Sequence, residues 1–209
     1  MGIARRAWYL LAGAAALGPS PVRAELTATA SQMHVRTGMV QGSISGAATS
    51  AQQNAAAKGF SIANSFDVDV EFFKTSKRSI FIRSTLAYDL SDSRVKYFYV
   101  GVGRRWYLGS DGMMFDASDQ GTAVSWQPKN RYYLGVDGGI SQTLALSLTQ
   151  AFGEYSTGIE VGAHGGATIP VGKTLGLDVQ AGFGYAYGFT SVSVTTTVIR
   201  FLVGVSLYL

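Results

Sequence analysis

The sequence predicts an all-β protein that crosses a membrane as an antiparallel up-and-down β-barrel of eight strands, with ten strands as the alternative. Three observations support this fold class. Apolar and polar residues alternate with period two over most of the chain, the polar positions are rich in glycine, and an export signal stands at the N-terminus. Only 14% of the 209 residues are charged, against roughly 25% in soluble domains. The chain has no cysteine, which excludes disulfides and thiolate metal sites.

The basic balance of the chain is concentrated at its N-terminus. Three of the 17 Lys and Arg residues precede residue 25, whereas all 13 acids lie at or after it, which leaves 14 basic against 13 acidic residues. A nearly neutral and sparsely charged chain lacks the basic surface that nucleic acid requires. We therefore expect no nucleic-acid partner.

The first 24 residues have the layout of a secretory signal peptide. Arg5 and Arg6 precede an apolar stretch of 12 residues, and the small-residue site Val22-Arg23-Ala24 follows. Because a membrane-spanning helix needs about 20 apolar residues, this stretch is too short to be one. The sequence thus predicts residues 1–24 as a signal peptide that is removed after Ala24.

Residues 25–59 form a segment of uncertain structure. Within it, residues 50–58 could form a short helix and residues 34–45 a strand. The histidine of this segment, His34, is expected to be solvated.

Residues 60–209 are predicted to form the barrel. Phe66, Val68, Val70 and Phe72 share one face of the first segment, with acids on the other face. Eight such segments are expected, at residues 66–72, 80–86, 97–105, 133–140, 144–149, 160–167, 175–184 and 200–209. The alternative is a soluble β domain, whose strands would also alternate. It is disfavoured because the polar faces hold glycine, Ser and Thr rather than plentiful Lys and Glu.

Aromatic pairs stand at several segment ends and suggest girdles at the membrane interfaces. These pairs are Phe72-Phe73, Trp106-Tyr107, Tyr132-Tyr133 and Tyr185/Tyr187.

The last hairpin, residues 169–188 with residues 202–209, resembles that of small bacterial outer-membrane β-barrel proteins. The resemblance implies a cell outer membrane location, the lipid bilayer as surroundings, and a C-terminal strand read by the outer-membrane insertion machinery. It also implies that both ends of the barrel face the periplasm. The family usually ends in an aromatic residue, whereas this chain ends in Leu209 with Tyr208 before it.

Counting strands back from Leu209 assigns the connections to the two sides. Residues 90–94, 141–143 and 169–173 are expected in the periplasm. Residues 74–78, 153–157, 188–195 and the long connection 108–130 are expected outside. The long connection has 23 residues, which is well above the usual length and indicates a function or disorder. Its Met113, Met114 and Phe115 are predicted to pair with a strand ending at Trp126, as an external hairpin that serves as the contact candidate.

Ten polar residues are predicted to form a paired network in the lumen, because isolated charges there are costly. They are Asp67, Asp69, Glu71, Arg83, Arg105, Asp137, Glu160, His164, Asp178 and Arg200. One hairpin register places Asp69 opposite Arg83. Another places His164 near Asp178, with Arg200 close by.

These observations predict a non-enzymatic membrane scaffold or surface-binding protein with a plugged lumen, without cofactor or metal. The first alternative is a narrow channel or carrier for small solutes. The second is a lipid-modifying hydrolase that uses His164 as its base with a hydroxyl such as Ser147.

Overall fold

The computed structural model describes residues 31–46, 60–91, 94–108, 113–118, 121–126, 129–145, 154–172, 174–189 and 194–209. The signal-peptide prediction for residues 1–24 and the helix prediction for residues 50–58 lie outside these ranges. Within them, no helix is long and apolar enough to span a membrane.

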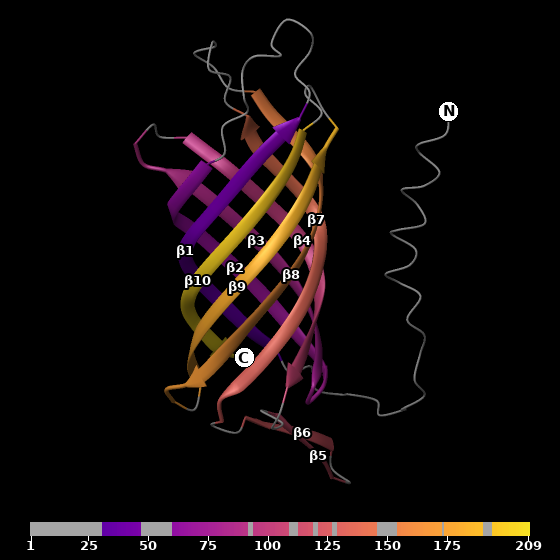
Figure 1. Ribbon diagram of the computed structural model, residues 1–209. Helices are drawn as coiled ribbons and strands as arrows, with labels where there is room; N and C mark the ends of the chain where they lie inside the picture. Colours follow the sequence, from indigo (N-terminus) through magenta and orange to yellow (C-terminus); the bar gives the residue numbers. More distant parts are fainter. Residues whose placement is uncertain are drawn as a thin grey trace, which may run out of the picture.

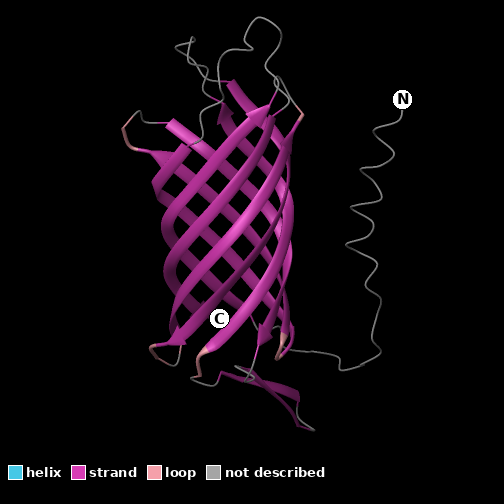
Figure 2. Cartoon of the chain, viewed as in Figure 1, coloured by secondary structure: helices cyan, strands magenta, loops and turns pink. Residues whose placement is uncertain are grey.

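Eight antiparallel strands close a barrel, as Figures 1 and 2 show. They are β1 (Ser31–Gly46), β2 (Phe60–Thr75), β3 (Arg78–Asp89), β4 (Arg94–Leu108), β7 (Arg131–Ala145), β8 (Glu154–Pro170), β9 (Leu175–Gly188) and β10 (Val194–Tyr208). Each strand pairs with its neighbour along the chain, and β1 pairs with β10 to close the wall. The prediction of an eight-stranded antiparallel barrel is confirmed.

Two of the eight strands differ from the predicted segments. The wall begins at Ser31 rather than at residue 60, because β1 belongs to it. Residues 131–145 form one continuous strand instead of two segments with a turn at 141–143. Ser141 and Thr143 imitate a turn in the sequence, but both are buried side chains that point into the lumen. The possible strand at residues 34–45, which stood outside the predicted eight segments, and the spurious break together leave the number of strands unchanged.

Both ends of the wall lie at one end of the barrel, where Gln32 pairs with Tyr208. We call this the terminal end. The strand directions place Thr75, Leu108 and Pro170, the ends of β2, β4 and β8, there as well. Gly46, Asp89, Ala145 and Gly188, the ends of β1, β3, β7 and β9, lie at the opposite end (Figure 1). The long connection therefore shares a side with both chain ends.

Several predicted sides are thereby wrong. Residues 74–78 and 108–130 lie on the side of the chain ends rather than across from them, and residues 90–94 lie across from them. Counting back from Leu209 gives correct sides as far as β8. The spurious turn at 141–143 then reverses every connection that precedes it.

The outer face of the wall is largely apolar, and the inner face carries most of the buried polar and charged side chains. On β2, Phe66 is 54% exposed while the neighbouring Asp67 and Asp69 are fully buried. The same alternation runs through β3, β9 and β10. Such a wall satisfies its backbone groups internally and turns apolar side chains outward, as a lipid environment requires.

The aromatic pairs at the strand ends are divided between the two faces. Phe72 and Tyr132 point outward, whereas their neighbours Phe73 and Tyr133 are 3% and 1% exposed and lie inside. Tyr107 packs between the two inner rings. Its ring centroid lies 5.4 Å from that of Phe73 and 5.8 Å from that of Tyr133. The predicted girdle thus holds one member of each of these pairs, and the other member fills the lumen.

Glycine makes close approaches possible at two points of the wall. At Gly38 the register of β1 against β2 shifts, and a Cβ there would collide with the carbonyl oxygen of Phe201. At Gly135 a Cβ would collide with the imidazole of His164. A glycine at 135 therefore leaves room for this ring inside the barrel.

Two short strands, β5 (Met113–Ser118) and β6 (Gly121–Trp126), pair within the long connection. Met113 lies opposite Trp126 and Phe115 opposite Val124, so the predicted hairpin register is confirmed. Figure 1 shows this hairpin beyond the terminal end of the wall.

Candidate functional site

The candidate site is the interior of the barrel, which holds an unusual number of buried charges. Six carboxylates and five arginines lie inside, together with two histidines. These residues are Asp67, Asp69, Glu71, Asp137, Glu160 and Asp178; Arg36, Arg83, Arg105, Arg131 and Arg200; His34 and His164. Because burial of unpaired charge is costly, the arrangement of these side chains determines whether the wall can close.

Arg36 on β1 is the centre of the network in the terminal half. Its Nη1 donates to Asp67 Oδ1 at 2.7 Å and to Asp69 Oδ2 at 2.6 Å, and its Nε donates to Asp178. One guanidinium therefore holds carboxylates from strands on both sides of β1. A branched donor with fixed geometry is suited to this role.

Arg105 on β4 links two of the acids from the other side of the lumen. Its Nη2 donates to Asp69 Oδ2 at 3.0 Å, and its Nη1 donates to Glu71. The hydroxyl of Tyr107 also donates to Glu71, at 2.8 Å. The Cζ atom of Arg105 lies 4.4 Å from the ring centroid of Tyr133 and 4.7 Å from that of Phe81, so the guanidinium group also makes cation–π contacts.

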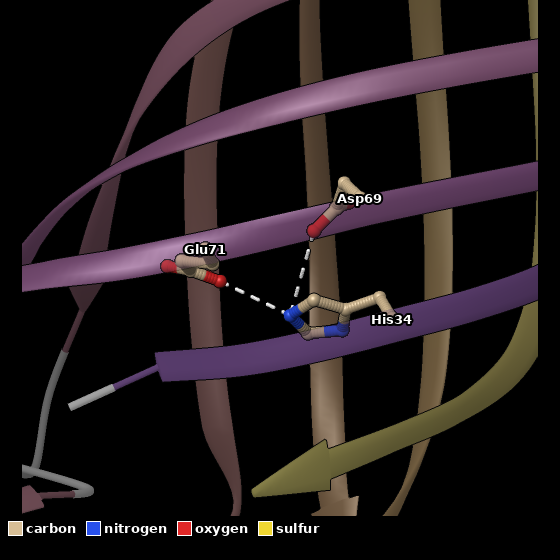
Figure 3. Close-up of side chains that lie close together, drawn as sticks. All are labelled: His34, Asp69 and Glu71. Atoms are coloured by element: carbon tan, nitrogen blue, oxygen red, sulfur yellow. Dashed lines mark hydrogen bonds and ion pairs between the residues drawn. The ribbon is translucent and has the colours of Figure 1, made fainter. Parts of the chain in front are cut away.

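His34 lies among three carboxylates, two of which are drawn in Figure 3. Its Nε2 lies 3.0 Å from Glu71 Oε2 and 3.8 Å from Asp69 Oδ1, and its Nδ1 lies 3.3 Å from Asp178 Oδ2. The side chain is fully buried, so the expectation that His34 is solvated is wrong. When protonated, it supplies the sixth positive charge opposite the six acids.

The middle of the lumen holds a second group of pairs. Glu160 accepts from Arg200 and, at 2.8 Å, from the hydroxyl of Tyr97. Asp137 accepts at 2.6 Å from the hydroxyl of Tyr99, and its other oxygen lies 3.0 Å from Nδ1 of His164. Tyrosines and arginines thus supply the donors that these buried carboxylates require.

All ten residues of the predicted network are buried inside the barrel, but they do not always meet the predicted partner. Asp69 does lie opposite Arg83 in the register, yet Arg83 Nε donates to Asp67 at 2.7 Å. His164 meets Asp137 rather than Asp178, since the β8–β9 register places Thr168 opposite Asp178.

Three titratable residues of the interior are absent from the predicted network. Arg36 and His34 are not predicted there because β1 carries few large apolar residues, and Arg131 is not because it stands at the first position of β7. Arg131 donates to Gln32 Oε1 at 2.8 Å near the terminal end. The polar alternation Gln32, His34, Arg36 against Met33 and Val35 is the signal that identifies β1 as a wall strand.

His34, Asp69 and Glu71 form one group within the described residues whose ligand atoms lie within 4.8 Å of one another. Asp69 Oδ1, which points toward His34, has no hydrogen-bond partner there. However, Arg105 donates to both carboxylates of the group and Arg36 donates to Asp69. Two guanidinium groups so close make an ion-pair network the better description than a site for a divalent cation.

His164 has an acid partner, Asp137, but no hydroxyl is hydrogen-bonded to its Nε2 in the part of the chain that the structure describes. Its Nε2 has no hydrogen-bond partner within the described residues, and the ring packs against Phe81 at 5.3 Å and Tyr133 at 6.2 Å. A hydrolase requires a hydroxyl near this nitrogen and room for a substrate. Ser147, the nucleophile considered from the sequence, lies outside the described residues.

Comparisons with known proteins address the fold. No protein-family model and no curated protein matches the sequence. Among solved structures, Neisserial surface protein A (NspA) aligns with a TM-score of 0.51 over 86% of this chain and 97% of its own length, at 12% identity. The chain has the fold of the small eight-stranded outer-membrane β-barrels.

Two further barrels of this kind align less well. The N-terminal β-barrel domain of OprF from Pseudomonas aeruginosa covers 87% of this chain and 100% of its own, with 9% identity and a TM-score of 0.44. Ail, the attachment invasion locus protein of Yersinia pestis, covers 85% and 99%, with 9% identity and a TM-score of 0.42.

Proposed function

We propose that the protein is a non-enzymatic scaffold of the bacterial outer membrane, a barrel with a filled lumen whose connections make its contacts. The carrying observation is the division of the wall into two faces. Large apolar side chains such as Phe66, Val102 and Phe201 are 52–59% exposed outside, while six carboxylates and five arginines are buried inside. A soluble protein would bury the first set and expose the second.

The filled interior favours a scaffold over a channel. An eight-stranded barrel encloses just enough space for side chains or one small ligand. In this chain the paired charges of the terminal half and the tyrosines of the middle occupy that space. The same interior disfavours a hydrolase, because the His164–Asp137 pair is enclosed by rings.

Export and assembly are assigned from the sequence. The predicted signal peptide, residues 1–24, would direct the chain across the inner membrane. The C-terminal strand β10 would be read by the outer-membrane insertion machinery. With the chain ends in the periplasm, the hairpin of Met113, Met114, Phe115 and Trp126 serves a periplasmic contact. The opposite end of the wall, where β1, β3, β7 and β9 end, then makes the external contacts.

Heat modifiability tests the barrel. The purified chain, refolded in detergent, is expected to be rich in β structure by circular dichroism and to change its migration on a cold SDS gel when boiled. A chain that stays soluble without detergent and migrates alike before and after boiling contradicts the proposal. Planar bilayers then separate scaffold from channel, because a filled lumen should show no steady conductance.

Cysteine labelling tests the orientation. Because the sequence has no natural cysteine, only the introduced residue can react. Leu90→Cys lies in an exposed turn at the opposite end, and Gly172→Cys in an exposed turn at the terminal end. In intact cells a membrane-impermeant maleimide should label the first variant and not the second. Ser118→Cys in the hairpin should behave like Gly172→Cys. Surface labelling of Gly172→Cys would reverse the proposed orientation.

A further inference from the structure

A groove of about 640 Å³ runs over the outer face of the wall at β7–β10. Across four neighbouring strands the register aligns Leu134, Gly165, Ala181 and Phe201, so two small residues lie between two large ones. Leu134 and Phe201 are 54% and 52% exposed, which confirms that this row faces outward. Ala163 continues the small positions along β8, and Trp106 lies beside the groove.

A basic residue stands next to this groove on the same outer face. Arg104 lies between the outward residues Val102 and Trp106 on β4 and pairs in register with Val136, which lines the groove. It is half-buried and has no ion pair within the described residues. A charged arginine on an apolar, lipid-facing wall is unfavourable in free energy unless an anion or water contacts its guanidinium group.

Further positive charge lies nearby at the terminal end. Arg78 is exposed and pairs in register with Trp106, and Lys74 is exposed at the end of β2. The wall carboxylates of this half, Asp67, Asp69, Glu71 and Asp178, are all buried inside. The outer rim beside the groove therefore carries uncompensated positive charge within the described part of the wall.

We propose that the groove binds an acyl chain of an anionic phospholipid whose phosphate lies at Arg104 and Arg78. This inference rests on the proposed position of the wall in a membrane. Arg104 stands four residues before Leu108, the end of β4, so that its long side chain can reach the headgroup region of that leaflet. Guanidinium groups bind phosphate oxygens through two parallel hydrogen bonds, and basic sites beside apolar surfaces select anionic lipids.

Tryptophan quenching measures this binding at the site itself. The double variant Trp8→Phe/Trp126→Phe leaves Trp106 as the sole tryptophan, whether or not a leader has been removed. This protein is reconstituted into vesicles that contain a small fraction of brominated phosphatidylglycerol or of brominated phosphatidylcholine. We expect the anionic lipid to quench Trp106 more strongly at equal fractions.

Variants in this background separate the headgroup from the acyl chain. Arg104→Gln should weaken the apparent affinity for phosphatidylglycerol about fivefold, and Arg104→Lys should retain most of it. Ala181→Phe fills the groove and should abolish the preference between the two lipids. Ser84→Phe adds the same ring to the outer face of β3, away from the groove, and should leave the preference intact.

Equal quenching by both lipids in the parent protein, or a preference that Arg104→Gln and Ala181→Phe leave unchanged, overturns the inference. Quenching that increases for both lipids as the protein is diluted in the bilayer shows that a second copy covers the groove, which also overturns it. No quenching by either lipid shows instead that the wall is not in the bilayer. That result contradicts the proposed function itself, so the two failures are distinguishable.

Discussion

The two halves of the lumen are filled by opposite chemistry. Toward the terminal end, Arg36, Arg105 and His34 hold four carboxylates from β2 and β9. Toward the opposite end, beside the buried hydroxyls of Thr143, Ser156 and Thr196, the interior holds an apolar cluster. Its members are Val40, Ile44, Phe60, Ile62, Ala87, Tyr97, Tyr99, Val194 and Val198. The same wall therefore encloses an ion-pair network in one half and a small conventional core in the other.

The two halves should respond differently to substitution. An apolar cluster loses contacts in proportion to the atoms removed. A buried ionic network depends on matching, because deleting one member leaves another charge buried without a partner. The terminal half should therefore respond more sharply to single substitutions than the opposite half, even when the new side chain is apolar.

Among the substitutions in the two halves, Arg36→Leu should destabilise the protein most. It leaves Asp67, Asp69 and Asp178 without a shared donor, and we expect a loss of about 3–5 kcal/mol in the free energy of unfolding. Urea unfolding of the protein in detergent micelles measures it. Adding Asp178→Asn should recover part of the loss, since one unpaired charge is removed. A loss below that of Val198→Ala would refute the account of the terminal half.

Val198→Ala probes the apolar half. Val198 is fully buried in the apolar cluster, and the loss of two methyl groups should lower the free energy of unfolding by about 2 kcal/mol. The same unfolding experiment applies. Val203→Ala, on the outer face of the same strand, is the matched control and should have a smaller effect, because Val203 is 53% exposed.

Tyr97→Phe probes the junction of the two halves. Tyr97 belongs to the apolar cluster, yet its hydroxyl donates to Glu160 at 2.8 Å and accepts from Arg200. Removing the hydroxyl alone should reduce the free energy of unfolding by about 1–2 kcal/mol. Tyr185→Phe on the outer face of β9 provides a comparison in which the hydroxyl is not inside the lumen. Equal effects of the two variants would argue against the junction.

Replacing residues 113–126 by a short Gly/Ser linker should have the smallest effect. Leu108 and Tyr132 are already paired neighbours, so the ends of the connection need no hairpin to hold them together. We expect a change within about 1 kcal/mol in stability and retained heat modifiability. Loss of the folded band on a cold SDS gel would show that the hairpin takes part in barrel assembly.

The sequence predicts the alternation of inward and outward residues well. The predicted number of strands is correct only because an omitted strand and a spurious break cancel. Residues 175–184 and 200–209 alternate cleanly over their whole length, and β9 and β10 are found where expected. In β1 the outward positions hold polar residues such as Thr37 and Gln41 beside Met33, Val35 and Met39, which weakens the period-two signal. Inward charges and few large apolar residues weaken the alternation of a strand, so that its sequence resembles that of a loop. β1 is the clearest case.

The partners inside the lumen depend on register and shear, which composition cannot supply. A hairpin centre moved by two residues exchanges Asp178 for Gly182 opposite His164. Moreover, Arg36 reaches acids on β2 and, past β10, on β9, and Arg105 on β4 reaches acids on β2 past β3. Sequence alternation identifies which residues face inward, but only the closed wall decides which of them meet.

The pairing of Gln32 with Tyr208 also bears on protein engineering. The first and last strands are hydrogen-bonded neighbours whose ends meet. The closed wall therefore does not depend on which strand comes first in the chain. A short peptide could join the two ends, and new termini could be opened within the connection 109–130, which lies at the same end. Such a circular permutant would begin at β7 and end at β4 while keeping every strand pair of the wall.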